Sequence, residues 1–322
     1  MTIAGNIVAL SGGVGGAKLA TGLANLLPPG RLTIIANTAD DFEYHGLHIS
    51  PDIDSLMYAL AGVNNPDTGW GRDVESWTFM SELERLGLES WFRLGDRDLA
   101  VHVYRTSCLK SGRSLSSVTE DLCARFGIGA RIAPMSDDAV GTVVRTDVGE
   151  LPFQEYFVRR QCRPSVKAIS FAGADDAAPS PRFLAALEDP GLAGIVICPS
   201  NPWLSIDPIL SLPGAAAAIA DSRAPVAAVS PIVQGKSIKG PTARIMADLG
   251  IPVSASSVAR HYATLVDAFV LDSLDESIGQ EIADHGIAVE IANTVMGTAD
   301  DREELARRVL GLLSRMSGAD LR

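Results

Sequence analysis

Residues 6–36 read NIVALSGGVGGAKLATGLANLLPPGRLTIIA. Asn6–Leu10 is a short apolar run typical of a buried β-strand, and Ser11–Gly16 is a glycine turn. Ala17–Leu27 has the apolar spacing of a helix, and two prolines and a glycine end it. Leu32–Ala36 is a second apolar strand. Residues 6–36 therefore predict a strand–helix–strand unit, from which parallel sheets are built.

The rest of the chain repeats this alternation. Helical stretches lie between most of five further apolar runs, and buried parallel strands have this continuous apolar pattern. We therefore expect an α/β protein with a Rossmann-like, doubly wound, mainly parallel sheet. The five runs are residues 168–171, 194–198, 226–229, 268–271 and 288–291.

The alternation is interrupted between about residue 70 and about residue 126. The pattern there predicts helices at 74–86, 99–110 and 115–125, with Ser114 capping the last. We predict a single domain over residues 1–322 with a helical insertion at about residues 70–128. Residues 130–160 are expected to add a β excursion. The final helix, residues 301–316, is expected to pack on the sheet edge through one apolar face.

Composition limits the possible partners. The chain has 322 residues, 47% of them hydrophobic, and a formal net charge of −12 at pH 7. An acidic chain is unsuited to nucleic-acid backbones, so a phosphorylated ligand has to be held locally. The four cysteines have no metal-binding spacing and are expected to be reduced. Because the sequence shows neither a secretory signal nor a membrane span, we predict a cytoplasmic protein without membrane contact.

The glycine turn after the first strand is the first candidate site. Its glycines let the backbone approach a ligand closely, and the next helix directs its N-terminal amides toward that ligand, which suits phosphate. The turn does not fit the Walker A motif, and a lysine stands where the dinucleotide-binding fingerprint needs a small residue. A tight turn without a ligand is the alternative. The candidate phosphate-binding residues are Gly12, Gly13, Gly15, Gly16 and Lys18.

Two acidic segments follow the second strand. Asp40 and Asp41 stand at its carboxyl end, where open parallel sheets bind ligands, and suggest a divalent cation. The alternative is an Asx turn with a solvated acid pair. Ser50–Pro51 is a good helix start, which puts Asp52 and Asp54 in the first turn. These acids either complement the helix dipole or, pointing in different directions, serve different ligands.

Three further loops carry polar groups suited to ligands. Residues 91–98 place opposed charges and aromatic rings around a glycine, which suits a planar polar ligand. Residues 199–206 follow a strand with amide and hydroxyl groups that suit a purine base, and residues 230–241 hold two lysines suited to a diphosphate. An ordinary surface turn is the alternative for each loop. The candidate binding residues are Arg93, Arg97, Ser200, Asn201, Lys236 and Lys239.

Taken together, these segments resemble the 2-phospho-L-lactate transferases of coenzyme F-420 biosynthesis. The resemblance implies a Rossmann-like core that binds Mg²⁺ and a guanosine-diphosphate derivative of a phospho-acid. It further implies that the phospho-acid is transferred to the deazaflavin FO, with GMP as the second product. The matching pieces run in order over about residues 6–241: SGGVGGAKL, NTADD, HGLHISPDIDSLMYALAG, GWGRD, WFRLGDRDLA, FQEYFVRR, PSNPWLSI and SPIVQGKSIKG.

The resemblance also suggests residue roles. Asp40 and Asp52 are the expected catalytic carboxylates that hold Mg²⁺, and Asp41 is the less favoured metal ligand. Lys18 and the glycine amides are expected to neutralise charge on the transferring phosphate.

By the same resemblance, FO is expected near Asp54, Arg93 and the Asp96–Arg97 turn. Which residue, if any, is the general base stays open. The phospho-acid is phosphoenolpyruvate, 2-phospho-L-lactate or 3-phospho-D-glycerate. A homodimer is an option for the family.

Two other protein classes are alternatives. Regulators of the gluconeogenesis-factor type bind nucleotide sugars without evident turnover, and we expect a Gly-Gly-Ser run after their acid pair. This chain has Phe42-Glu43-Tyr44 there. A nicotinamide oxidoreductase needs an acid at the end of the second strand, where Asn37 stands.

Overall fold

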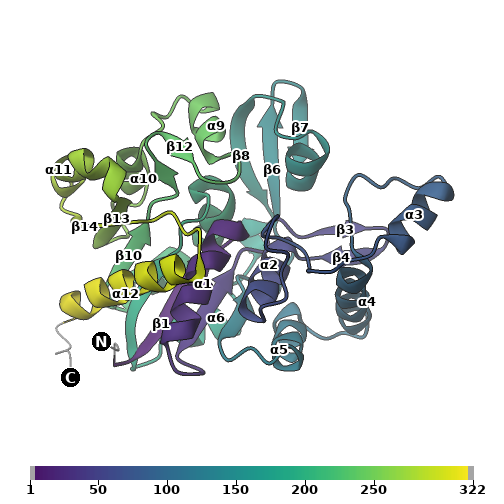
Figure 1. Ribbon diagram of the computed structural model, residues 1–322, viewed down its shortest axis with the longest axis horizontal. Coiled ribbons are helices and arrows are strands. Elements are labelled where there is room, and N and C mark those ends of the chain that lie inside the picture. Colours follow the sequence, from purple (N-terminus) through teal and green to yellow (C-terminus); the bar gives the residue numbers. More distant parts are fainter. Residues whose placement is uncertain (1–3, 318–322) are drawn as a thin grey trace.

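The centre of the protein is a seven-stranded sheet in the order β14-β13-β10-β9-β1-β2-β5, and every neighbouring pair is parallel (Figure 1). The computed structural model describes residues 4–317. From β1 the chain builds outward through β2 to β5, then returns to β9 on the other side of β1. The strand order therefore reverses between β1 and β9, where open α/β sheets bind ligands. The strands are β1 (Asn6–Ser11), β2 (Leu32–Ala36), β5 (Arg131–Pro134), β9 (Leu192–Ile197), β10 (Val226–Val229), β13 (Ala268–Asp272) and β14 (Ala288–Ala292).

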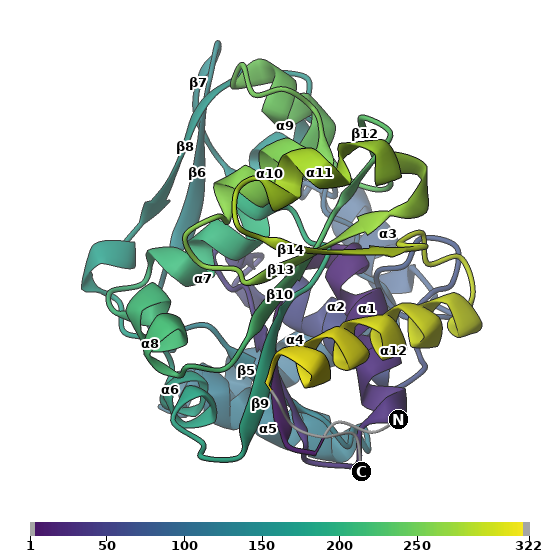
Figure 2. The same cartoon turned by 90° about the vertical axis from the view of Figure 1, so that its left-hand side faces the viewer.

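Helices cover both faces of this sheet (Figure 2). Strands β2 and β10 are buried at every residue, which explains their continuous apolar sequences and confirms the doubly wound α/β prediction. One core lies under α1 (Gly13–Leu26), α2 (Pro51–Leu60), α5 (Leu115–Arg125) and α12 (Ala299–Met316). The other lies under α6 (Pro181–Leu187), α7 (Asp207–Ser211), α8 (Ala215–Asp221), α9 (Thr242–Asp248), α10 (Ala255–His261) and α11 (Gly279–Ala283).

The chain between β2 and β5 is a long crossover. The three predicted helices are present as α3 (Thr78–Arg85), α4 (Asp96–Lys110) and α5, and the backbone N–H of Ser117 donates to Ser114 Oγ at 3.2 Å, so Ser114 caps α5. The same crossover holds a hairpin of β3 (Phe42–Tyr44) and β4 (Leu47–Ile49), which the sequence analysis missed because each strand has three residues.

The strand predicted at 168–171 belongs to a different sheet. It is β8 (Val166–Ala172), which pairs antiparallel with β6 (Gly141–Thr146), and β6 pairs with β7 (Gly149–Pro152). Lys167 and Ser170 of β8 are exposed, whereas a central parallel strand is buried on both faces. The β-structure predicted at residues 130–160 is present but belongs to two sheets. Strand β5 joins the edge of the main sheet, whereas β6 and β7 form the three-stranded sheet with β8.

Two helix predictions need correction. Helix α1 starts at Gly13, not Ala17, and Gly15 and Gly16 pack against the loop after β9, which offsets their low helix propensity. Helix α12 contacts α1, β9, β10 and β14, so it packs on a face of the sheet and not on its edge. The remaining elements are β11 (Ile232–Val233), β12 (Lys236–Ser237), the 3₁₀ turns at Ala174–Asp176 and Ser273–Ile278, and the π turns η1 (Glu155–Arg159) and η3 (Pro202–Ile206).

Within residues 4–317, no single helix has the length and apolar composition needed to cross a membrane. The segments Pro202–Ser211 and Ala215–Asp221 reach that composition as a pair, with a bend of 81° between them.

Candidate active site

A cavity of about 520 Å³ opens at the point where the strand order reverses. The glycine turn after β1 and the loop after β9 form one wall, and the first turns of α2 and α4 form another. Loops after β10 and β14 and the η1 turn complete the lining. We call the part beside Gly12, Asp40 and Asp52 the glycine-turn end, and the part beside Asp54, Asp98 and His102 the α4 end.

The glycine turn is fixed by contacts with neighbouring loops. Gly12 N–H donates to Ser200 Oγ at 3.0 Å, and that hydroxyl donates back to the Gly12 carbonyl at 2.8 Å. A Cβ on Gly15 would lie 2.6 Å from the carbonyl oxygen of Pro199, and one on Gly16 would overlap two serine hydroxyls. The two loops at the strand-order reversal therefore fit together because these residues lack side chains. Gly12, Gly13 and Gly15 line the cavity, whereas Gly16 is not part of its lining.

Asp40 is a buried carboxylate at the same end. It is 5% exposed, and its Oδ1 accepts no hydrogen bond from the described residues. Burial raises the pKa of Asp40 well above its ordinary value, and the charge of Asp52 raises it further. The sequence prediction placed Asp40 beside Asp52 at a ligand site, and the structure brings both to this cavity.

Asp52 joins α2 to the glycine turn. Its Oδ1 accepts from Gly13 N–H at 2.7 Å, and its Oδ2 accepts from Asn37 Nδ2 at 3.0 Å. Burial nevertheless raises the pKa of Asp52 to about 6. No Lys or Arg side chain bonds to Asp40 or Asp52 within residues 4–317. This end of the cavity therefore holds two carboxyl groups that are costly to ionise and that no Lys or Arg contacts directly among the described residues.

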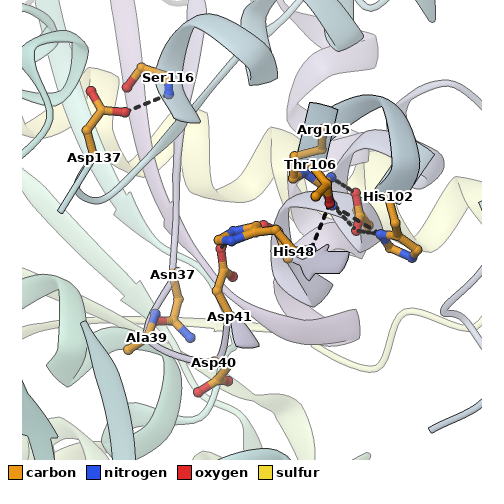
Figure 3. Close-up of polar contacts among 12 residues, drawn as sticks. Asn37, Ala39, Asp40, Asp41, His48, His102, Arg105, Thr106, Ser116 and Asp137 are labelled. Atoms are coloured by element: carbon orange, nitrogen blue, oxygen red, sulfur yellow. Dashed lines mark hydrogen bonds and ion pairs between the residues drawn. The ribbon is translucent and has the colours of Figure 1, made fainter. Parts of the chain in front are cut away.

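Asp41 faces elsewhere. Its side chain points to the opposite side of the backbone from that of Asp40 (Figure 3). Ser50 Oγ donates to Asp41 Oδ2 at 2.6 Å, and His48 Nε2 lies 3.1 Å from the same oxygen. Ser50 precedes α2 as predicted, but its hydroxyl makes this bond and does not cap the helix. Asp41 is absent from the cavity lining, which favours Asp40 as the site carboxylate.

Asp54 lies at the α4 end, two residues beyond Asp52. Its two carboxylate oxygens accept from both terminal nitrogens of Arg105, and Arg105 is fully buried. Asp52 and Asp54 thus contact different groups, as their spacing on the helix predicted. Arg105 was not predicted, because a buried arginine on a helix gives no distinctive sequence signal.

A third carboxylate, Asp98, stands beside this pair. Tyr58 Oη donates to Asp98 Oδ1 at 2.5 Å, and His102 Nε2 lies 3.2 Å from the same oxygen. Burial opposes ionisation of Asp98, but His102, Tyr58 and the charge of Arg105 together hold its pKa below the ordinary value. Asp54, Asp98 and His102 offer ligand atoms within 4.8 Å of one another, yet the Arg105 guanidinium already occupies both Asp54 oxygens and disfavours a metal ion there.

Comparison with known proteins identifies the family of this chain. The family model described as 2-phospho-L-lactate transferase CofD matches residues 7–310. The chain belongs to the 2-phospho-L-lactate transferase family. It is 40% identical over 317 residues to a phosphoenolpyruvate transferase of Kitasatospora aureofaciens, covering 96% of this chain and 98% of the relative. It is 36% identical over 304 residues to a 2-phospho-L-lactate transferase of Methanosarcina mazei, covering 94% and 99%.

Solved structures show the same fold at low sequence identity. A Bacillus halodurans protein of the upf0052 family matches with a TM-score of 0.60 and 15% identity, covering 96% of this chain and 100% of that one. The α/β fold of this transferase-family chain is therefore shared more widely than its sequence motifs.

Of the three lysines predicted to bind phosphate in this member of the transferase family, two line the cavity. Lys18 Nζ donates to the Met296 carbonyl at 2.7 Å, and burial, followed by the charges of Lys239 and Arg302, lowers its pKa. Lys239 Nζ donates to the Thr68 carbonyl at 3.0 Å. Both line the cavity, whereas Lys236, exposed on β12, does not.

The remaining residues predicted for the transferase-family site also differ in whether they line the cavity. Ser200 and Asn201 line the cavity, and Asn201 Oδ1 caps η3 while its Nδ2 has no partner among the described residues. Arg93 lines the cavity with its guanidinium 4.3 Å from the Trp77 ring centroid. Arg97 is exposed and outside the lining.

Proposed function

We propose that this transferase moves a phospho-acid from its guanosine-diphosphate derivative to the deazaflavin FO, releasing GMP. The observation that carries the proposal is one cavity with two unlike ends. A helix N-terminus and uncompensated carboxylates lie at the glycine-turn end, while aromatic side chains line the wall toward the α4 end. The first suits a diphosphate with a cation, and the second suits a flat ring system.

Asp40 and Asp52 fit a Mg²⁺ ion. Asp40 has a buried oxygen without a partner, and each carboxylate is costly to ionise where it stands. Mg²⁺ is commonly held by one or two carboxylates together with phosphate oxygens. When bound, the ion would offset charge on the transferring phosphate.

The protein groups around this position have separable tasks. The N–H groups of Val14 and Gly15, in the first turn of α1, have no partner within the helix and are suited to diphosphate oxygens. Lys18 and Lys239 add positive charge on the same side. In the reaction, a ribityl hydroxyl oxygen bonds to the phosphorus of the phospho-acid while the bond from that phosphorus to the GMP oxygen breaks. Alignment and charge neutralisation are the main requirements of such a transfer.

The acid we propose for the first test is phosphoenolpyruvate. The relatives named phosphoenolpyruvate transferase are 36% identical in Mycobacterium and reach 40% and 41% in Kitasatospora and Streptomyces griseus, whereas the two Methanosarcina relatives named 2-phospho-L-lactate transferase are 36% identical. Mass spectrometry of the product formed from FO with each guanylylated acid tests this choice, and a product carrying lactate or glycerate would replace it.

A binding measurement tests the nucleotide. GDP is expected to raise the melting temperature, because a ligand that binds the folded state selectively stabilises it. Stabilisation by UDP-N-acetylglucosamine with none by GDP would overturn the proposal in favour of a nucleotide-sugar regulator.

A further inference from the structure

Helices α3 and α4 cap one another at the α4 end of the cavity. The Glu75 carboxylate, ahead of α3, accepts from the N–H groups of Arg97 and Asp98, each at 2.8 Å, in the first turn of α4. In return, the Asp96 carboxylate accepts from two N–H groups at the start of α3 at 3.0 and 3.1 Å. A Cβ at Gly95 would overlap the Glu75 carboxylate. This reciprocal cap fixes the first turn of α4 and with it the position of Asp98.

Asp98 keeps one oxygen available. Its Oδ1 accepts from Tyr58 and lies 3.2 Å from His102 Nε2, whereas Oδ2 has no hydrogen-bond donor among residues 4–317. The side chain is 14% exposed and lines the cavity. Because both oxygens of the neighbouring Asp54 are bonded to Arg105, Asp98 is the carboxylate at this end that can accept a further donor.

Helix α2 sets the distance between the two ends. Asp52 holds the glycine turn and Tyr58 holds Asp98. Six residues separate them, which is about 9 Å along a helix axis. The reacting hydroxyl has to lie at the glycine-turn end, so a ring carried on an extended ribityl chain reaches the α4 end. Tyr58, which holds Asp98, and Phe92, just before α4, line the cavity and offer apolar surface to that ring.

We propose that Asp98 is a specificity-determining residue that accepts the imide N–H of the acceptor ring, with Glu75 as its positioning residue. The inference rests on the proposed function, because it takes FO as the acceptor. FO carries two acidic groups, an imide N–H and a ring hydroxyl. An anionic hydroxylate would be repelled by the Asp98 carboxylate, whereas the imide N–H donates to it. The hydroxyl then lies away from Asp98.

The test combines a ligand change with a protein change. FO and N3-methyl-FO, which lacks the imide N–H, are titrated by fluorescence against the wild-type protein, Asp98→Ala and the control Val103→Ala, an exposed residue of α4 outside the cavity lining. We expect N3-methylation to weaken binding to the wild type and to Val103→Ala by about tenfold or more, and to leave binding to Asp98→Ala nearly unchanged. GDP binding, measured by thermal shift, is expected to be equal in all three proteins.

The outcomes separate this inference from the proposed function. A wild-type protein that turns over FO but binds N3-methyl-FO as tightly as FO overturns the Asp98 assignment alone. A wild-type protein that neither binds nor converts FO overturns the proposed function and this inference with it. The comparison of the two ligands on the wild type needs no variant, so a poorly folded Asp98→Ala protein does not prevent the decision.

Glu75 is tested by how it affects KM and kcat. Glu75→Ala is expected to raise KM for FO by about fivefold while leaving kcat at saturating FO and KM for the guanylylated donor unchanged. Glu75→Gln keeps one acceptor oxygen and is expected to restore part of the effect. A lowered kcat with an unchanged KM for FO would show that Glu75 does not orient the acceptor-binding carboxylate.

Discussion

The two ends of the cavity hold equally buried carboxylates in opposite electrostatic states. Asp40 and Asp52 are 5% and 7% exposed, and Asp54 is 5% exposed. At the glycine-turn end the pKa values of Asp40 and Asp52 are raised, while at the α4 end Asp54 has a bidentate arginine and the pKa of Asp98 is lowered. The groups that contact each carboxylate, and not its burial, account for the difference between the two ends. The glycine-turn end needs a ligand to supply positive charge, whereas the α4 end supplies its own.

The largest expected effect comes from closing the glycine-turn end. Gly15→Val places a branched side chain against the Pro199 carbonyl oxygen, where even a Cβ would lie at 2.6 Å. The turn has to shift, so we expect GDP affinity, measured by calorimetry, to fall by about 10³-fold or more, roughly 4 kcal/mol.

The control for Gly15→Val is Gly141→Ala on β6, where an added Cβ meets no atom within 4 Å. It should bind GDP like the wild type. A Gly15→Val protein with a native circular-dichroism spectrum and wild-type GDP affinity would show that the turn is not the phosphate site.

Removing Arg105 would give the α4 end the same charge imbalance as the glycine-turn end. Arg105→Met leaves Asp54 buried without its cation, and we expect the free energy of unfolding to fall by about 3–5 kcal/mol in urea titrations. The exposed pair of Arg125 and Asp121 provides the control, since Arg125→Met should change stability by less than about 1 kcal/mol. Equal losses in the two variants would contradict the stated contrast between the ends.

Removing charge from Asp40 tests the glycine-turn end without changing its shape. Asp40→Asn should lower turnover by a factor of about 10² or more, roughly 3 kcal/mol, while FO binding is retained. Raised Mg²⁺ is expected to restore part of the activity if metal affinity is lost. Asp41→Asn is the matched control, because Asp41 lies outside the cavity lining, and its turnover should stay within about threefold of wild type. Wild-type turnover in folded Asp40→Asn would refute the metal assignment.

The sequence predicted the part of the molecule that local patterns encode. Apolar runs located β1, β2, β9, β10, β13 and β14, and motif order located the glycine turn and Asp40 at one sheet edge. The Asp54–Arg105 pair and the cap between Glu75 and α4 were not predicted. Asp54 and Arg105 are 51 positions apart, and Glu75 and Arg97 are 22 positions apart. Which residues meet over such distances depends on how the crossover between β2 and β5 packs.

The β8 error has a related physical cause. A run such as VKAISFA suits a parallel strand by its apolar content, but Lys167 and Ser170 are exposed and, three residues apart, point to opposite faces of the strand, so neither face of β8 is fully buried. Two polar residues among seven, Lys167 and Ser170, are the sequence feature that marks β8 as incompletely buried.

The smallest expected effect is a pH dependence of stability that belongs to the glycine-turn end. The pKa of Asp52 is about 6 in the folded protein against an ordinary value of 3.8. Between these values the folded state binds more protons than the unfolded state, so the free energy of unfolding falls as pH rises and levels off above the folded pKa. Since one pKa unit corresponds to about 1.4 kcal/mol, a loss on the order of 2 kcal/mol is expected from pH 4 to pH 7 without Mg²⁺. The pKa of Asp40 is also raised, so Asp40 adds a decline of its own. Asp52→Asn should remove the Asp52 part of the decline and leave that of Asp40. Mg²⁺ should stabilise the wild type more at pH 7 than at pH 5, because the ion binds the ionised carboxylates. Urea titrations across this range measure both effects. Parallel pH profiles for the wild type and Asp52→Asn would show that the Asp52 charge is not the destabilising group, and the contrast between the two ends of the cavity would then depend on Asp40 alone.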